Sequence, residues 1–162
     1  MAMYALDAEV HIEGRDGPRS VHVRQFYRLP ADRPDQDNIL EAGDVITAVT
    51  LTAPRTGRHI YRKVRDRSSY AFALVSVAGI VDMDSGKISS AALAFGGLAH
   101  KPWHDPAIDE ILVGEKPSSA LFDKAADILL GDARGYGAND FKIPLARRTL
   151  HAALAELTGD SA

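Results

Sequence analysis

The chain of 162 residues contains no cysteine, and this absence excludes several kinds of chemistry. Without thiols the chain forms no disulfide and offers no thiolate nucleophile. It also cannot bind zinc or an iron–sulfur cluster through sulfur. Any redox reaction in which the protein takes part therefore needs a cofactor from outside the chain.

Three other signals are missing. The formal net charge of −3 gives no basic excess of the kind that nucleic-acid binding requires. No stretch approaches the roughly 18 consecutive apolar residues of a membrane helix. Met1 to Val10 has neither a cationic segment nor a long apolar segment, so no secretory signal is expected. We therefore predict a cytoplasmic protein that binds neither nucleic acid nor membrane, with export as part of a complex left open.

The first hundred residues are typical of β-structure. Apolar and polar residues alternate in several runs that are separated by glycine, proline or aspartate. The expected strands are a hairpin between Tyr4 and Phe26, a strand over Val45–Leu51, and two long strands over Tyr70–Met83 and Lys87–Gly96. Asp84-Ser-Gly86 has the composition of a tight turn between the last two. The intervening segment Leu29–Asn38, rich in proline and aspartate, is expected to be a surface loop.

Helical signals follow from residue 105 onward. Asp105 is a plausible N-cap with Pro106 at the first helical position, and Ser118 or Ser119 suits the cap of a second helix. The expected helices cover Ala107–Val113, the segment from Ser119 to just before Gly131, and Phe141–Leu157. Strands followed by helices predict an α+β fold, in which an antiparallel sheet is packed on one face by a C-terminal bundle of about three helices.

A dense block of cations precedes the longest apolar run, which extends from Tyr70 to Val81. The block consists of Arg58, His59, Arg62, Lys63, Arg65 and Arg67. One interpretation is a solvated strand edge, where charge also prevents edge-to-edge aggregation. The other is a site for an anion or a polar cofactor, because a cation near a flavin stabilises negative charge on the reduced ring. Composition alone does not choose between them.

Other polar and aromatic residues give weaker signals. His100 and His104 have helical metal-ligand spacing, but Pro102 lies between them and opposes a helix. We therefore predict no metal site and no catalytic residue. Trp103 is expected to be a packing anchor at the junction of sheet and helices, and Tyr136 an exposed loop residue.

Several segments together resemble the flavoprotein subunit of the molybdenum hydroxylases, the group of xanthine dehydrogenase, aldehyde oxidoreductase and carbon monoxide dehydrogenase. The similar segments are Leu40-Glu-Ala-Gly-Asp-Val-Ile46, the run from Tyr61 through Lys63 and Arg67 into Ala71-Phe-Ala-Leu-Val-Ser-Val-Ala78, Ala94-Phe-Gly-Gly-Leu-Ala-His-Lys-Pro-Trp103, Glu110-Ile-Leu-Val-Gly114, and Asn139-Asp-Phe-Lys-Ile-Pro-Leu-Ala-Arg-Arg-Thr-Leu150. The last two are most similar to the bacterial aldehyde-oxidoreductase branch. Their shared order makes a chance similarity a poor explanation.

The resemblance implies a cofactor site and a division of the chain. In the family, the lysine at the place of Lys63 contacts FAD, and the aliphatic residue at the place of Ile46 lies beside it. Residues 1–54 would be a remnant of the second FAD-binding lobe, a hairpin plus a strand within a partial α+β lobe. Residues 55–162 would be the flavoprotein C-terminal α+β domain. The chain would thus be the last half of such a subunit.

The implied function is electron transfer in an oxidoreductase complex. Electrons from iron–sulfur clusters in a small subunit would reach FAD and pass to an acceptor, after substrate oxidation in a large molybdopterin-binding subunit. The sequence has no Ala-Gly-Gly-Thr-Asp-type loop, which in the family cradles the FAD pyrophosphate. The alternative hypothesis is therefore a non-catalytic scaffold or interaction domain of the same fold that binds no FAD alone, with a homo-oligomer as one possible assembly. Substrate and electron acceptor do not follow from the sequence.

Overall fold

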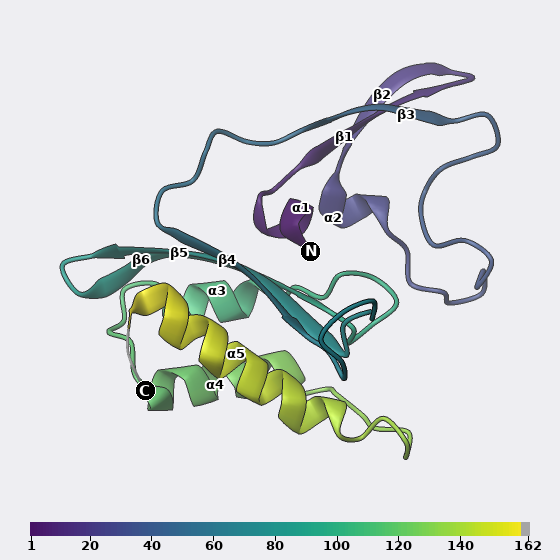
Figure 1. The fold of residues 1–162 in the computed structure, drawn as a ribbon. Coiled ribbons are helices and arrows are strands. Elements are labelled where there is room, and N and C mark those ends of the chain that lie inside the picture. The colour runs from purple at the N-terminus through teal and green to yellow at the C-terminus, as the bar shows by residue number, and fades with distance from the viewer. Residues whose placement is uncertain (160–162) are drawn as a thin grey trace.

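The computed structural model describes residues 1–159, which form two three-stranded antiparallel sheets and five helices (Figure 1). The first sheet comprises β1 (Glu9–Gly14), β2 (Gly17–His22) and β3 (Val45–Thr50), in the order β2-β1-β3. The predicted hairpin is confirmed over Glu9–His22 and the strand after it is confirmed, but the prediction that the hairpin strands reach Tyr4 and Phe26 was wrong. Two short helices, α1 (Ala2–Ala5) and α2 (Val23–Phe26), occupy the two ends of the predicted hairpin segment.

The second sheet comprises β4 (Arg58–Val64), β5 (Val75–Asp84) and β6 (Lys87–Gly96), in the order β4-β5-β6. The prediction that the first long strand begins at Tyr70 was wrong, because β5 begins five residues later. Tyr70 has a positive φ of 50°, which breaks an extended strand. The turn between β5 and β6 is confirmed, with Ser85 and Gly86 both at positive φ, as this type of hairpin requires.

Three helices cover one face of the second sheet: α3 (Pro106–Leu112), α4 (Ser119–Leu130) and α5 (Lys142–Thr158) (Figure 1). The predicted caps are present. The Asp105 carboxylate accepts a hydrogen bond from the Ala107 amide at 3.0 Å, and the Ser118 hydroxyl oxygen accepts one from the Leu121 amide at 3.2 Å. The α+β fold class and its one-sided helical layer are confirmed. Within residues 1–159, none of the helices has the length and apolarity needed to cross a bilayer.

Two apolar clusters hold these layers together. The larger lies between the second sheet and helices α3 to α5, and contains Val77, Phe95, Leu112, Phe122 and Leu154. The smaller lies on the opposite face of the same sheet, where α1, α2 and β1 pack onto β5 and β6. Its sheet side consists of Ala78, Ile80, Ala92 and Ala94. The sheet is thus covered on both faces, but β4 at its edge is only partly covered.

Candidate functional site

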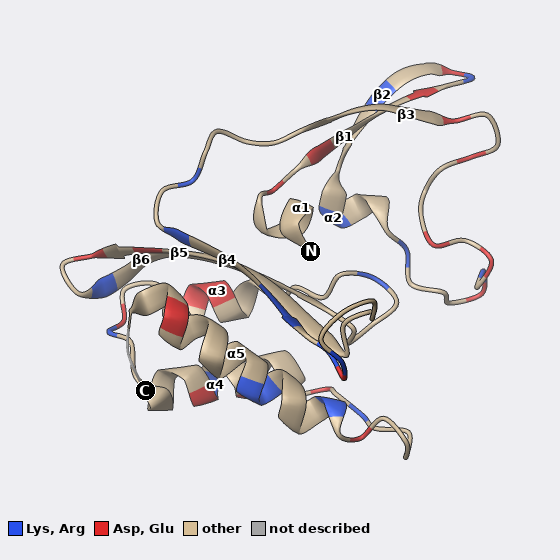
Figure 2. Cartoon of the chain, viewed as in Figure 1, with Lys and Arg blue, Asp and Glu red and all other residues tan. Residues whose placement is uncertain are grey.

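Arg58, His59, Arg62 and Lys63 of the cationic block lie on β4, the edge strand of the second sheet, which carries blue bands in Figure 2. Arg65 and Arg67 follow the end of this strand. Residues of a strand point alternately to its two faces. Ile60 packs against the helical cluster, and Arg62 forms an ion pair with Glu156 of α5. His59, Tyr61 and Lys63 therefore point to the opposite face, on the side of α1 and α2, and all three are exposed.

Lys63 is a cation without a partner. Its register neighbour on β5 is Ser76, whose side chain is buried. Within residues 1–159, the Lys63 ammonium group makes no hydrogen bond or ion pair with another side chain or with the backbone. Tyr61, two positions away on the same face, is 54% exposed and supplies an aromatic surface beside the ammonium group. This arrangement is suited to a planar ligand that carries negative charge on one edge.

Ile46 lies in the other sheet, on the edge strand β3. An irregularity in the pairing of β1 with β3 places Ile12 opposite Ile46, and Val10 opposite Val49. Cross-strand partners share a face, so Ile46 and Val49 point the same way as the buried side chains of Val10 and Ile12. That direction is toward the cluster containing α1 and α2. Ile46 is nevertheless 44% exposed.

The two predicted cofactor residues thus lie on faces directed toward the same helical layer, one in each sheet. No contact joins Ile46 to Lys63. Both residues are exposed, whereas neighbouring residues on the same faces of the two sheets are buried against α1 and α2. A ligand between the two strands would meet an aliphatic surface from β3, and an aromatic ring and an ammonium group from β4.

The remaining cations of the block are mostly engaged within the protein. Arg58 donates to the Glu156 carbonyl at 3.2 Å, and the His59 imidazole contacts the Arg55 carbonyl oxygen at 3.0 Å. Arg67 donates to the Tyr70 carbonyl, with its guanidinium 5.9 Å from the centre of the Tyr70 ring. The strand-edge interpretation therefore describes most of the block. Among its described residues, the side chains of Lys63 and Arg65 have no partner, and of these two only Lys63 lies on β4.

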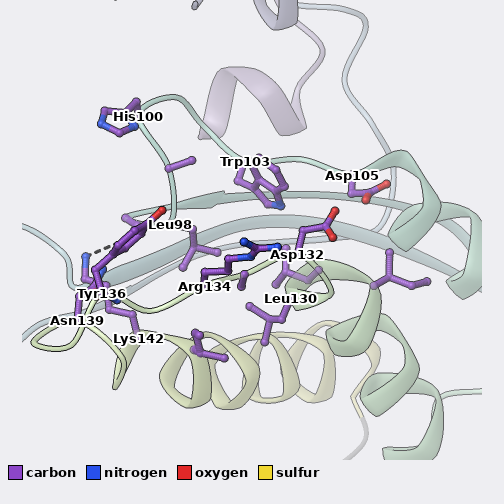
Figure 3. Close-up of a pocket in the computed structure, with 16 residues that line it drawn as sticks. Leu98, His100, Trp103, Asp105, Leu130, Asp132, Arg134, Tyr136, Asn139 and Lys142 are labelled. Atoms are coloured by element: carbon purple, nitrogen blue, oxygen red, sulfur yellow. Dashed lines mark hydrogen bonds between the residues drawn. The ribbon is translucent and has the colours of Figure 1, made fainter. Parts of the chain in front are cut away.

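A separate cavity of about 700 Å³ lies between the α4–α5 connection and the segment after β6 (Figure 3). Figure 3 shows the Arg134 side chain directed into it. Its polar and aromatic lining comprises His100, Trp103, Asp105, Asp132, Arg134, Tyr136, Asn139 and Lys142. The Asn139 side chain accepts a hydrogen bond from the Tyr136 amide at 2.7 Å, and the Lys142 ammonium donates to the Gly97 carbonyl at 3.0 Å.

This cavity does not indicate a class of ligand. Its two cations, Arg134 and Lys142, are balanced by the carboxylates of Asp105 and Asp132. No sequence motif indicated this cavity, because its walls come from segments far apart in the chain. Trp103 pairs with Phe95 through two backbone hydrogen bonds of 2.7 and 2.8 Å and packs against the helical cluster, consistent with the predicted anchor.

The two histidines with metal-ligand spacing lie in different surroundings. His100 lines the cavity, whereas the side chain of His104 is buried and engaged in hydrogen bonds to Leu93 and Arg24. Across residues 1–159, no group of three or more histidine, aspartate or glutamate residues is arranged to hold a metal ion.

Comparison with known proteins identifies relatives along almost the whole chain. Residues 59–157 match the family described as the CO dehydrogenase flavoprotein C-terminal domain. The aldehyde oxidoreductase FAD-binding subunit PaoB of Escherichia coli is 45% identical over 157 residues, which cover 96% of this chain and 46% of that protein. The carbon monoxide dehydrogenase medium chain of Afipia carboxidovorans is 27% identical over 148 residues, covering 91% of this chain and 49% of that protein.

Solved structures share the fold. A chain of the Cu,Mo-CO dehydrogenase superposes with a TM-score of 0.84 at 23% identity, covering 99% of this chain and 56% of that one. A chain of quinoline 2-oxidoreductase from Pseudomonas putida 86 gives 0.81 at 22% identity, covering 97% and 54%. At these identities the likeness concerns the fold alone. The present chain spans about half the length of the relatives it matches.

Proposed function

Because this chain belongs to the family of CO dehydrogenase flavoprotein C-terminal domains, we propose that it serves as the C-terminal part of an FAD-binding subunit in a molybdenum-hydroxylase complex. Its task would be to help carry electrons from iron–sulfur clusters through FAD to an acceptor. The similarity to the E. coli aldehyde oxidoreductase subunit supports this role most directly. By the same proposal, residues 1–54 form part of a second FAD-binding lobe and residues 55–162 form the C-terminal domain.

The residues present fit the ring system of FAD but not its pyrophosphate. The exposed face of β4 offers an aromatic ring and an unpaired ammonium group, Tyr61 and Lys63, and β3 offers the aliphatic side chain of Ile46. These groups suit a flat, partly apolar ring that carries polar atoms at its edge. No glycine-rich loop that could cradle a pyrophosphate occurs in the sequence. The chain therefore accounts for contacts to the ring system, and the phosphate contacts must come from elsewhere.

FAD, when bound, supplies the capacity to accept and release electrons. The proposed contribution of Lys63 is to hold a polar edge of the ring by a charge-assisted hydrogen bond and to stabilise negative charge there. Ile46 would limit the access of water to one side of the ring. The helices α3 to α5 pack on the opposite face of the sheet and keep β4 and β5 in place.

The proposed partners are a large molybdopterin-binding subunit and a small iron–sulfur subunit. Because these 162 residues contain no cysteine, the ligands of any iron–sulfur cluster must lie outside them. The names of the relatives, an FAD-binding subunit and a medium chain, describe members of multi-subunit enzymes and support this assignment.

Replacing Lys63 by alanine is expected to weaken FAD binding by about tenfold, the loss associated with one charge-assisted hydrogen bond. The measurement is a titration of flavin fluorescence with the purified protein. Lys87→Ala is the matched control, because Lys87 is also an exposed lysine on a strand of this sheet, at the start of β6. This variant should bind FAD as the wild type does.

Two results would count against the proposal. Equal affinities for the wild type and Lys63→Ala would remove Lys63 from the site. Unchanged flavin fluorescence with wild-type protein would refute binding by this chain alone. The alternative of a non-catalytic scaffold, which the missing pyrophosphate loop favours, would then describe the isolated protein better.

A further inference from the structure

One hydrogen bond connects the N-terminal and C-terminal parts of the protein. The guanidinium of Arg24, on α2, lies 2.7 Å from the Nε2 atom of His104, in the segment before α3. Among the described residues, it is the only hydrogen bond or ion pair between residues 1–50 and residues 58–159. The two parts also share a buried apolar cluster, whose sheet side is made largely of alanine side chains.

The geometry fixes the protonation state of His104. Arginine only donates hydrogen bonds, so Nε2 of His104 must be the acceptor and carries no proton. The Nδ1 atom lies 2.7 Å from the Leu93 carbonyl oxygen, which only accepts, so Nδ1 carries the proton. His104 is therefore neutral. Its side chain is only 7% exposed, so water cannot replace either partner.

Charged groups surround this contact from both parts of the protein. On the N-terminal side, the Asp7 carboxylate lies 3.4 Å from the Arg24 guanidinium and 2.9 Å from the His22 imidazole. On the C-terminal side, Asp109 of α3 accepts a hydrogen bond from the Leu93 amide at 3.1 Å and lies 3.7 Å from His104 Nε2. Asp105 and Arg55 act on the same site through their charges.

We propose that the Arg24–His104 contact is an acid-sensitive clasp, which holds the N-terminal part on the second sheet and opens when His104 is protonated. A proton on Nε2 removes the only acceptor of the Arg24 hydrogen bond and places two cations in contact. The Nε atom of Arg24 is already buried without a partner, so release into water satisfies it. The clasp does not depend on the proposed flavin function.

The order of protonation supports the proposal. Burial raises the pKa of Asp109 to about 7, while burial lowers the pKa of His104 below its ordinary value. As the pH falls, Asp109 is thus protonated first and ceases to be a counter-charge for an imidazolium. The clasp then opens at a pH below about 6.5, the ordinary pKa of histidine.

The sole tryptophan, Trp103, is adjacent to His104 and reports on the clasp. Its fluorescence and the hydrogen exchange of residues 1–26 are measured from about pH 8 to about pH 5, with exchange corrected for its intrinsic pH dependence. Wild-type protein is expected to show both signals changing together below about pH 6.5. Exchange of residues 1–26 should accelerate by up to about tenfold per pH unit, as linkage to a single proton requires.

Variants separate the clasp from other titrating groups. His104→Gln cannot gain a proton, so both signals should stay constant over the same range. The control His151→Gln changes a histidine of α5 on the far side of the sheet, and should titrate like the wild type. A His104→Gln variant that titrates like the wild type overturns the proposal. So does wild-type protein in which His104 is protonated while residues 1–26 keep their protection.

A measurement on unaltered protein keeps the test valid if His104→Gln does not fold. Two-bond proton–nitrogen correlations of the histidine rings identify which ring nitrogen carries the proton. At about pH 8 we expect the proton of His104 on Nδ1. A proton on Nε2, or on both nitrogens, contradicts the acceptor role on which the clasp rests.

Discussion

Replacing Gly97 by alanine is expected to destabilise the protein by at least about 3 kcal/mol, because two independent penalties combine at this position. Gly97 has a φ of +82°, a conformation that strains any residue with a Cβ atom. A Cβ placed there would lie 2.5 Å from the Leu74 carbonyl oxygen. That carbonyl belongs to the backbone and directly precedes β5, so it cannot move without displacing the sheet. Denaturant unfolding should show a lower midpoint with an unchanged m-value.

Gly114 provides a matched control for the strain alone. Its φ of +84° is nearly the same, but nothing lies within 4 Å of a Cβ built there. Gly114→Ala should therefore lose only about 1 kcal/mol. If both variants lost the same free energy of unfolding, the close approach of the Leu74 carbonyl would not contribute to the loss. The glycine at position 97 would then not be explained by this steric contact.

The sequence predicted the elements whose signals are local. Asp105 and Ser118 cap their helices as expected, because an N-cap needs only a side-chain acceptor a few residues before an apolar run. The β5–β6 turn was equally predictable from Asp84-Ser-Gly86. Fold class followed from the order of strands and helices, and the resemblance to flavoprotein subunits agreed with the comparisons.

Features set by distant parts of the chain were not predictable in the same way. Tyr70 and Phe72 continue the apolar run into β5, but both are more than 90% exposed because the backbone turns before Val75. Composition cannot distinguish an apolar residue in a strand from one in an exposed loop. Likewise Arg24 and His104 are 80 residues apart, and nothing in either local sequence indicates that they meet.

The candidate flavin site was partly predictable from local sequence and partly set by distant parts of the chain. Lys63 could be selected because family resemblance added information that the cationic block itself lacks. The structure adds that its neighbours Arg58, Arg62 and Arg67 are engaged within the protein, which leaves Lys63 free for a ligand. For Ile46 the strand was predictable but its face was not, since the irregular pairing of β1 with β3 decides which side chains share a side.

Asp109 is expected to make the stability of the protein fall as the pH rises through about 7. Burial raises its pKa from 3.8 to about 7 in the folded protein. A group whose folded pKa is raised stabilises fully below its unfolded pKa, and this stabilisation is lost as the pH rises through the folded value. The shift corresponds to about 4 kcal/mol over the full pH range. Between about pH 6 and about pH 8, the loss should be roughly 1.4 kcal/mol.

The variant Asp109→Asn isolates this contribution. Asparagine keeps an oxygen that can accept the Leu93 amide hydrogen bond but has no proton to lose. Its unfolding free energy should lack the alkaline loss seen in the wild type. Asp132→Asn, which removes an exposed carboxylate, should retain it. A wild type and an Asp109→Asn variant with parallel stability curves from pH 6 to 8 would show that Asp109 is ionised throughout.

On the acid side the direction reverses, because the pKa of His104 is lowered by burial. Stability linked to a lowered pKa is present above the unfolded value and is lost as the pH falls through the folded value. Between the lowered folded pKa of His104 and its ordinary value of 6.5, this loss opposes the gain from Asp109, so the stability of the wild type should change little there and should fall as the pH rises through about 7. Asp109→Asn should remove the alkaline loss and expose the acid loss due to His104, whereas His104→Gln should leave a stability that keeps rising as the pH falls below about 6.5. If either substitution abolished the pH dependence that both groups contribute, Asp109 and His104 would share one proton as a coupled pair.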